Sequence, residues 1–162
     1  MENCYVVVAD GARARFFAMD EAVQGAGGPE LVELEDFANP EAESAGKELY
    51  SENKSGRNEA PVGAGAHGYD DHRDRHAAEL ERRFAKLVMG RAAQAANARS
   101  AQRVVIVAEQ RMLGHLRDAL AALPSSSWQV TETAKNLSKL SVHELHAHLA
   151  KDGLLPEREV PA

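Results

Sequence analysis

The run Arg103-Val-Val-Ile-Val-Ala108 constrains the fold more than any other segment, because it is continuously apolar after its first residue. A strand of this kind has both faces covered, as in parallel sheets that lie between helices. Segments with helical periodicity stand before and after it, and an alternation of helix, strand and helix indicates an α/β unit with right-handed crossovers. We therefore expect a central sheet whose inner strands are buried on both faces.

Four further segments indicate the rest of the sheet. Residues 5–9 are a β-rich apolar run that stops at the turn dipeptide Asp10-Gly11, which predicts a central strand and a hairpin into residues 12–17. Residues 31–37 read as a third strand, and residues 128–133 as an edge strand in which polar and apolar side chains alternate. The prediction is an α/β fold with a mixed central sheet of about five strands, flanked by helices.

The strongest helical pattern covers residues 74–98. The predicted core-facing stripe consists of Leu80, Phe84, Leu87, Val88 and Ala95. Three basic side chains, Arg75, Arg82 and Lys86, fall on a neighbouring solvent face. A short amphipathic helix is expected around Leu113, Leu116 and Leu120. The last helix begins at Ser141, where Ser141 and Glu144 have the spacing of a capping box.

Length and charge limit the classes of function. A chain of 162 residues fits one domain, and its formal charge of −6 argues against general affinity for nucleic acid, which requires basic side chains to neutralise phosphates. The charge is uneven, since residues 1–60 hold five basic and thirteen acidic side chains and residues 72–99 hold seven basic and three acidic ones. Any contact with a polyanion is therefore expected to be local.

Cysteine usage and the N-terminus indicate the compartment. Cys4 is the only cysteine, so no disulfide can form within the chain, and its place in an apolar strand predicts a buried thiol. The N-terminus lacks the features of a secretory signal, and no segment is long and apolar enough to span a membrane. We expect a cytoplasmic protein that does not enter membranes.

A polar, Gly-rich segment at about residues 41–71 predicts a flexible loop in front of the long helix. Its end, residues 63–68, matches the G-x-G-x-x-G pattern of dinucleotide sites, but no strand precedes it, so nucleotide binding is not expected. The interpretation adopted is a Gly-containing loop beside a cationic helix that reaches a phosphate-rich partner. The loop residues concerned are Gly63, Gly65, His67 and Gly68.

Arg13 and Arg15 form the second candidate site. In an extended backbone they project from one face, and paired guanidinium groups recognise phosphate with directional hydrogen bonds. The alternative is that they pair with carboxylates such as Glu33 or Glu35 on an adjacent strand, which is the commoner fate of exposed charges. Both interpretations stay open at this point.

The histidines carry weaker signals. His72 and His76 have the i, i+4 spacing of weak metal-ligand candidates, but further ligands held in a fixed geometry are not evident, so we expect solvated histidines and no metal site. His143, His146 and His148 on the last helix are expected at the surface. The sequence contains no nucleophile motif and no sign of a cofactor, so the expectation leans toward a protein without catalytic activity.

Taken together, four blocks of sequence carry a resemblance to a known family: residues 5–17, residues 31–37 with Asn39-Pro40, Leu113-Gly114, and residues 135–141. The chain resembles the bacterial host-attachment family, a branch of the release-factor-like proteins. Their fold is similar to the middle domain of archaeal and eukaryotic peptide-release factors and of Pelota. The resemblance implies one domain over residues 1–162 with an RNase H-like architecture.

In release factors of that superfamily, a Gly-Gly-Gln loop precedes a basic helix and helps water cleave the peptidyl-tRNA ester. Residues 63–68 stand at the matching place, but the sequence contains no Gly-Gly-Gln. The leading hypothesis is thus a non-catalytic module that binds ribosomal RNA or tRNA through the loop, Arg13, Arg15 and the basic helix face. The alternative is a protein-interaction factor in host attachment or stress physiology, with the acidic first third as its contact surface. The oligomeric state stays open.

Overall fold

The computed structural model describes residues 3–20, 29–41, 66–124 and 127–157, and all statements below concern these residues. The strands are β1 (Cys4–Ala9), β2 (Arg13–Asp20), β3 (Glu30–Ala38), β4 (Arg103–Ala108) and β5 (Gln129–Ala134). The helices are α2 (Ala66–Ala98), α3 (Gln110–Ala121) and α4 (Val142–Lys151). The predicted succession of strands and helices is confirmed, with ends that differ by a few residues except at the start of α2.

The five strands form one mixed sheet in the order β3-β2-β1-β4-β5. Hairpin neighbours β1 and β2 are antiparallel, as are β2 and β3, whereas β4 lies parallel to both β1 and β5. The α/β class is therefore confirmed. So are the central position of β1, the parallel environment of β4 and the edge position of β5.

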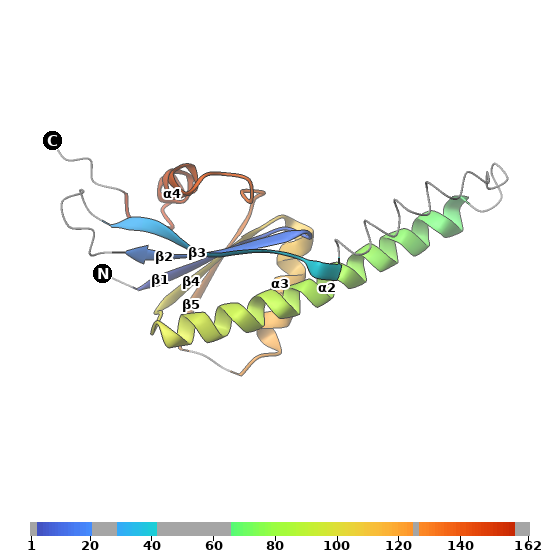
Figure 1. The fold of residues 1–162 in the computed structure, drawn as a ribbon, viewed down its shortest axis with the longest axis horizontal. Coiled ribbons are helices and arrows are strands. Elements are labelled where there is room, and N and C mark those ends of the chain that lie inside the picture. Colours follow the sequence, from blue (N-terminus) through green and yellow to red (C-terminus); the bar gives the residue numbers. More distant parts are fainter. Residues whose placement is uncertain (1–2, 21–28, 42–65, 125–126, 158–162) are drawn as a thin grey trace.

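Helices cover both faces of this sheet (Figure 1), with α2 and α3 on one face and α4 on the other. The α2/α3 side is built around Tyr5, Phe16, Phe84, Ile106 and Leu116, all at most 2% exposed. The opposite core holds Val6, Phe17, Val105, Leu145 and Leu149, which are fully buried, and Cys4 at its rim. Because side chains alternate along β1 and β4, each of these strands contributes residues to the core on both faces of the sheet.

The long helix α2 differs from its prediction in two respects. It begins at Ala66 instead of residue 74, so the last residues of the expected loop are helical. Residues 66–73 contain no proline, the residue that interrupts a helix most strongly, so their sequence is compatible with this extension. Leu87 is 40% exposed, because it lies to one side of the buried stripe, which consists of Phe84, Ala85, Val88, Met89, Ala92 and Ala96. Residues 42–65, including Gly63 and Gly65, lie outside the described residues.

Within the described ranges, none of the helices combines the length and the apolar character that crossing a membrane requires.

Tyr5 gives the sheet a pH-dependent reporter. Burial against Phe16, and then the negative charge of Glu35, raise the pKa of the Tyr5 phenol to about 12. Since the pKa of a tyrosine in an unfolded chain is about 10, the folded state holds the phenol proton more tightly than the unfolded state does. The contribution of Tyr5 to the free energy of unfolding should be fully present below about pH 10 and should be lost as the pH rises toward about 12. The difference in tyrosinate absorbance between wild type and Tyr5→Phe, followed against pH, measures the pKa of Tyr5. A pKa at the ordinary tyrosine value would contradict the burial of this phenol.

Candidate functional site

The guanidinium of Arg15 is at the centre of a polar network on the α4 side of the sheet. Its Nε and Nη2 donate to the two carboxylate oxygens of Glu33 at 3.1 and 2.7 Å. Its Nη1 donates to the backbone carbonyls of Ser138 and Leu140 at 3.1 and 2.6 Å. Arg15 is 8% exposed and lies over the ring of Phe17, 5.0 Å from the centroid. The group therefore holds strands β2 and β3 to the segment before α4.

An irregularity in β3 brings the acidic partners to the arginine side. Phe16 lies opposite Glu35 and Phe17 lies opposite Glu33, so Leu34 is an extra residue in the ladder. A bulge of this kind shifts the alternation of side chains by one residue. As a result, Glu33 before the bulge and Asp36 after it both reach the arginine-bearing face of β2.

Asp10 organises the turn between β1 and β2. Its Oδ1 accepts hydrogen bonds from the backbone N–H groups of Ala12 and Arg13 at 2.7 and 2.8 Å, which fits its place at the start of a turn. Its Oδ2 accepts a hydrogen bond from the Ser138 hydroxyl at 2.7 Å. The buried amide of Asn39 donates to the carbonyl of Gly11 at 3.1 Å. The turn is therefore fixed by side chains from both halves of the chain.

Around this network lies an open groove of about 890 Å³, which we call the Arg15 groove. Its charged lining consists of Asp10, Arg13, Arg15, Asp36, Lys139 and Glu144. Three of these side chains are acidic and three are basic. The groove thus has no net charge with which to attract a polyanion.

The two arginines of the groove are both paired. Arg13 binds Asp36 through two hydrogen bonds of 2.6 and 3.0 Å, and this partner raises the pKa of the guanidinium. The predicted shared face of Arg13 and Arg15 is confirmed, and so is the pairing of Arg15 with Glu33. A phosphate would have to displace these carboxylates before it could bind.

The basic face of α2 is partly neutralised. Arg82 donates to Glu79 with an Nε–Oε2 distance of 2.9 Å, and Arg83 lies within 3.2 Å of the same carboxylate. These partners, Arg82 foremost, lower the pKa of Glu79 to about 2. Arg75 and Lys86 are exposed, as predicted, and neither makes an ion pair with another described side chain. Among the described residues, these two are therefore the cations of this face that lack a carboxylate partner.

The beginning of α2 extends past the sheet, as Figure 1 shows. We call residues 66–77 the projecting end. Its backbone is helical through His67 and Gly68, its side chains are described from Arg75 onward, and Arg75, His76 and Ala77 are exposed. Among the side chains of α2 that the structure describes, from Arg75 onward, the first buried one is Phe84. Of these described side chains, the hydrophobic cores hold only those from Phe84 onward.

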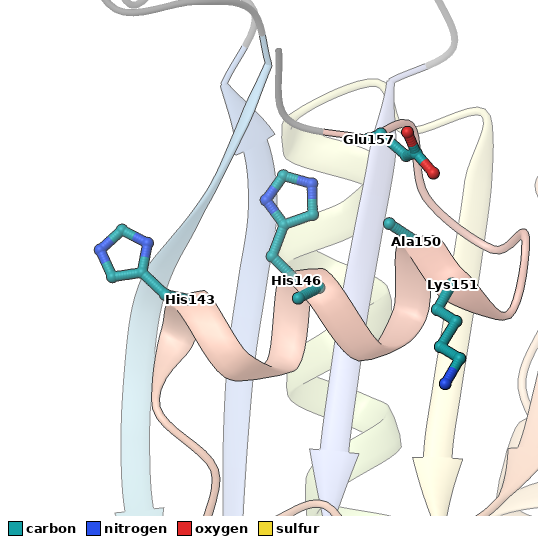
Figure 2. A pocket seen from close by; sticks show the side chains of 6 residues that line it. His143, His146, Ala150, Lys151 and Glu157 are labelled. Atoms are coloured by element: carbon teal, nitrogen blue, oxygen red, sulfur yellow. The ribbon is translucent and has the colours of Figure 1, made fainter. Parts of the chain in front are cut away.

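A further cavity, of about 440 Å³, lies beside α4. Figure 2 shows the rings of His143 and His146 projecting from the same side of α4, with Glu157 on the neighbouring segment. His146 is 4% exposed; its Nδ1 accepts from the Leu31 N–H at 3.4 Å, and its Nε2 is 2.9 Å from the Pro156 carbonyl. The expectation that His146 is a surface residue is wrong, because both ring nitrogens bridge α4 to its neighbours.

The structure does not bring the predicted site residues into one surface. Arg13 and Arg15 lie on the α4 side, whereas Arg75, Arg82 and Lys86 belong to the helix that covers the opposite face. The side chains of His67 and His72 lie outside the described residues, and His76 is exposed. Among the described side chains, no three His, Cys, Asp or Glu groups are placed to hold a metal ion.

Sequence reasoning missed Asp10, Ser138 and Asn39 as parts of the network. The Asp10-Gly11 dipeptide indicates only a local turn. The hydrogen bond between Asp10 and Ser138 joins residues 128 positions apart, so no local pattern could have indicated it.

The fold and these surfaces define a small α/β domain that holds its sheet and α4 together by an internal ion-pair network and extends one helix past the sheet. The family described as "Protein required for attachment to host cells" matches residues 5–149, and the chain belongs to this family. No curated protein matches the chain.

The network predicts unequal costs for its two arginines. Arg15→Ala would leave Glu33 and two carbonyls without their partner, so we expect a loss of about 3 kcal/mol in the free energy of unfolding. Arg13→Ala removes an exposed, solvent-screened pair, so its loss in the free energy of unfolding should be much smaller. Urea unfolding of both variants measures the difference. Equal losses would show that Arg15 does not hold the fold.

Proposed function

We propose that the protein is a non-catalytic binding module of the host-attachment family, and that it binds a protein partner through the projecting end of α2. The observation that carries this proposal is the shape of α2. The helix has 33 residues and a length of about 50 Å, and of its described side chains only those from Phe84 onward reach the cores.

A helix in water is stabilised mainly by burying an apolar face against the rest of the protein. The projecting end has almost no apolar surface to bury, since its sequence carries three aspartates, two arginines and three histidines. Helices that are polar all round commonly bridge between two bodies. The exposed helix therefore fits a segment that completes its contacts when a partner docks.

The charges favour a protein over a polyanion. Binding to nucleic acid depends on cations that are free to neutralise phosphates. Arg13, Arg15, Arg82 and Arg83 are instead paired with carboxylates of the same chain. The description of the family, attachment to host cells, also concerns interaction between cells rather than translation.

A second candidate function is binding to ribosomal RNA or tRNA, in line with the release-factor-like resemblance and its RNase H-like architecture. Arg75 and Lys86 support it, because both are exposed and unpaired among the described side chains. In this reading the segment with Gly63, Gly65, His67 and Gly68 would contact the nucleic acid beside these two cations. The same proposal takes residues 1–162 as one domain and places the protein in the cytoplasm.

Site-specific photo-crosslinking tests the leading proposal. A photoreactive residue at Ala77, exposed on the projecting end, should form adducts with a protein in intact cells, because the partner covers this end. The matched control is the exposed Gln94 on the packed half of the same helix, which should give none. The same substitution at Ala77 should reduce attachment of the cells without lowering the melting temperature. Equal adducts at both positions, or none at Ala77, would contradict the proposal.

Ribosome sedimentation separates the two candidates. We expect no co-sedimentation at low salt, because eight of the fourteen basic side chains that the structure describes are paired with carboxylates of the same chain. Each phosphate contact contributes about 0.7 to 0.9 to the slope of log affinity against log salt. Salt-sensitive co-sedimentation that is lost in Arg75→Ala/Lys86→Ala, and retained in the control Arg117→Ala on α3, would favour RNA and overturn the protein proposal.

A further inference from the structure

An open groove of about 630 Å³ lies between α2 and α3. We call it the α2/α3 groove. Part of its wall belongs to α2, at the base of the projecting end, and the rest belongs to α3. Its lining residues are Arg75, Ala78, Arg111, Gly114, His115 and Asp118. A partner that covers the projecting end would therefore also meet this groove.

The two arginines of the α2/α3 groove keep donors that no other described residue uses. Arg75 makes neither a hydrogen bond nor an ion pair with another described side chain. The Nε of Arg111 lies 3.1 Å from Oε2 of Glu81, but this oxygen accepts no hydrogen bond. Arg117, in contrast, donates hydrogen bonds to both carboxylate oxygens of its partner. Guanidinium groups with unused donors suit a carboxylate, which can accept two hydrogen bonds from one of them.

The charge that this groove presents to a ligand is positive. The side chain of Arg111 is 55% exposed, and Arg75 is exposed as well. The oxygen of Glu81 that is nearest to Arg111 is buried, so it is not presented to a ligand. Among the lining residues that the structure describes, the one acidic side chain is Asp118, about two helical turns after Arg111 on α3. Two cations against one carboxylate complement an acidic ligand.

Gly114 leaves space in the groove that the packing of this chain does not explain. Glycine in the interior of a helix is destabilising relative to alanine. A close neighbour or a positive φ would require glycine, but a Cβ added at Gly114 would meet nothing within 4 Å among the described residues, and its φ is not positive. The missing side chain therefore makes room for a group from outside the chain.

We propose that the α2/α3 groove receives an acidic segment of the protein partner, with a carboxylate side chain bound by Arg75 and Arg111 and a close approach to α3 at Gly114. This inference rests on the proposed function, because the projecting end contributes Arg75 to the groove. Two guanidinium groups flanked by Asp118 suit an isolated carboxylate better than the continuous row of phosphates that a nucleic acid presents.

Binding of an acidic peptide to the purified protein tests the groove directly. The probe is a fluorescein-labelled oligoglutamate, with oligoglutamine of equal length as the control peptide. Fluorescence anisotropy should show binding of oligoglutamate alone. Arg75→Gln should raise its dissociation constant at least about fivefold. Lys86→Gln removes an exposed cation of the same helix that does not line the groove, so it should have little effect. Equal effects of the two substitutions, or no binding, would overturn the proposal.

Two glycines in helix interiors allow binding to be separated from stability. Gly114→Ala and Gly90→Ala each add a methyl group where nothing lies within 4 Å, so both should raise the melting temperature. Only Gly114 lines the groove, so only Gly114→Ala should weaken oligoglutamate binding, by at least about fivefold. Weaker binding in both variants, or in neither, would contradict a close approach at Gly114.

Photo-crosslinking at Ala77 distinguishes a failure of this proposal from a failure of the proposed function. We expect Arg75→Gln and Gly114→Ala each to reduce the protein adducts formed at Ala77, and Lys86→Gln to leave them unchanged. Adducts that persist in the first two variants would reject the groove as the docking site and leave the proposed function intact. Absence of adducts in the wild type would reject the proposed function, and the affinity for oligoglutamate would then decide on the groove alone.

Discussion

The burial of one guanidinium group constrains the rest of this structure. Arg15 can lie beneath the segment before α4 only because Glu33 and two backbone carbonyls receive its hydrogen bonds. A buried charge that lost one of these partners would be strongly destabilising, so the bulge at Leu34 and the path of residues 138–140 are tied to it. The same contacts fix the segment that ends at Ser141, where the capping box starts α4.

This internal use of charge has a functional consequence. An acidic chain with local clusters of arginine suggests a docking site for phosphates, but most of those arginines are bound to carboxylates of the same molecule. The surfaces that remain for partners are of a different kind. One of them is a polar helix that extends beyond the sheet.

Local patterns predicted most of the fold. The apolar runs of β1 and β4, the Asp10-Gly11 turn and the Ser141–Glu144 capping box each have a signal that lies within a few residues, and each prediction is confirmed. Predictions failed where the cause is not local. The helical start of α2 has no cap signal at Ala66, and Leu87 is exposed because the face of α2 that meets the core is centred on Ala85, Met89 and Ala92.

The candidate site was predictable only in part. The shared face of Arg13 and Arg15 follows from strand geometry, and the pairing of Arg15 with Glu33 follows from the tendency of charges to find partners. The burial of His146 does not follow from a local pattern. Its two hydrogen-bond partners are the Leu31 N–H in a distant strand and the Pro156 carbonyl after the helix. The availability of Arg75 and Lys86, in contrast with Arg82, likewise depends on which carboxylates lie nearby.

Native-state hydrogen exchange along α2 tests most directly whether the helix is divided into a packed half and a partner-binding half. The account predicts that amides from Phe84 to Ala96 exchange only through global unfolding, because this half of the helix supplies the side chains that belong to the core. Amides of residues 66–77 should exchange much faster in the free protein and become protected when the partner captured at Ala77 is bound. Uniform protection along the whole helix in the free protein would contradict the account.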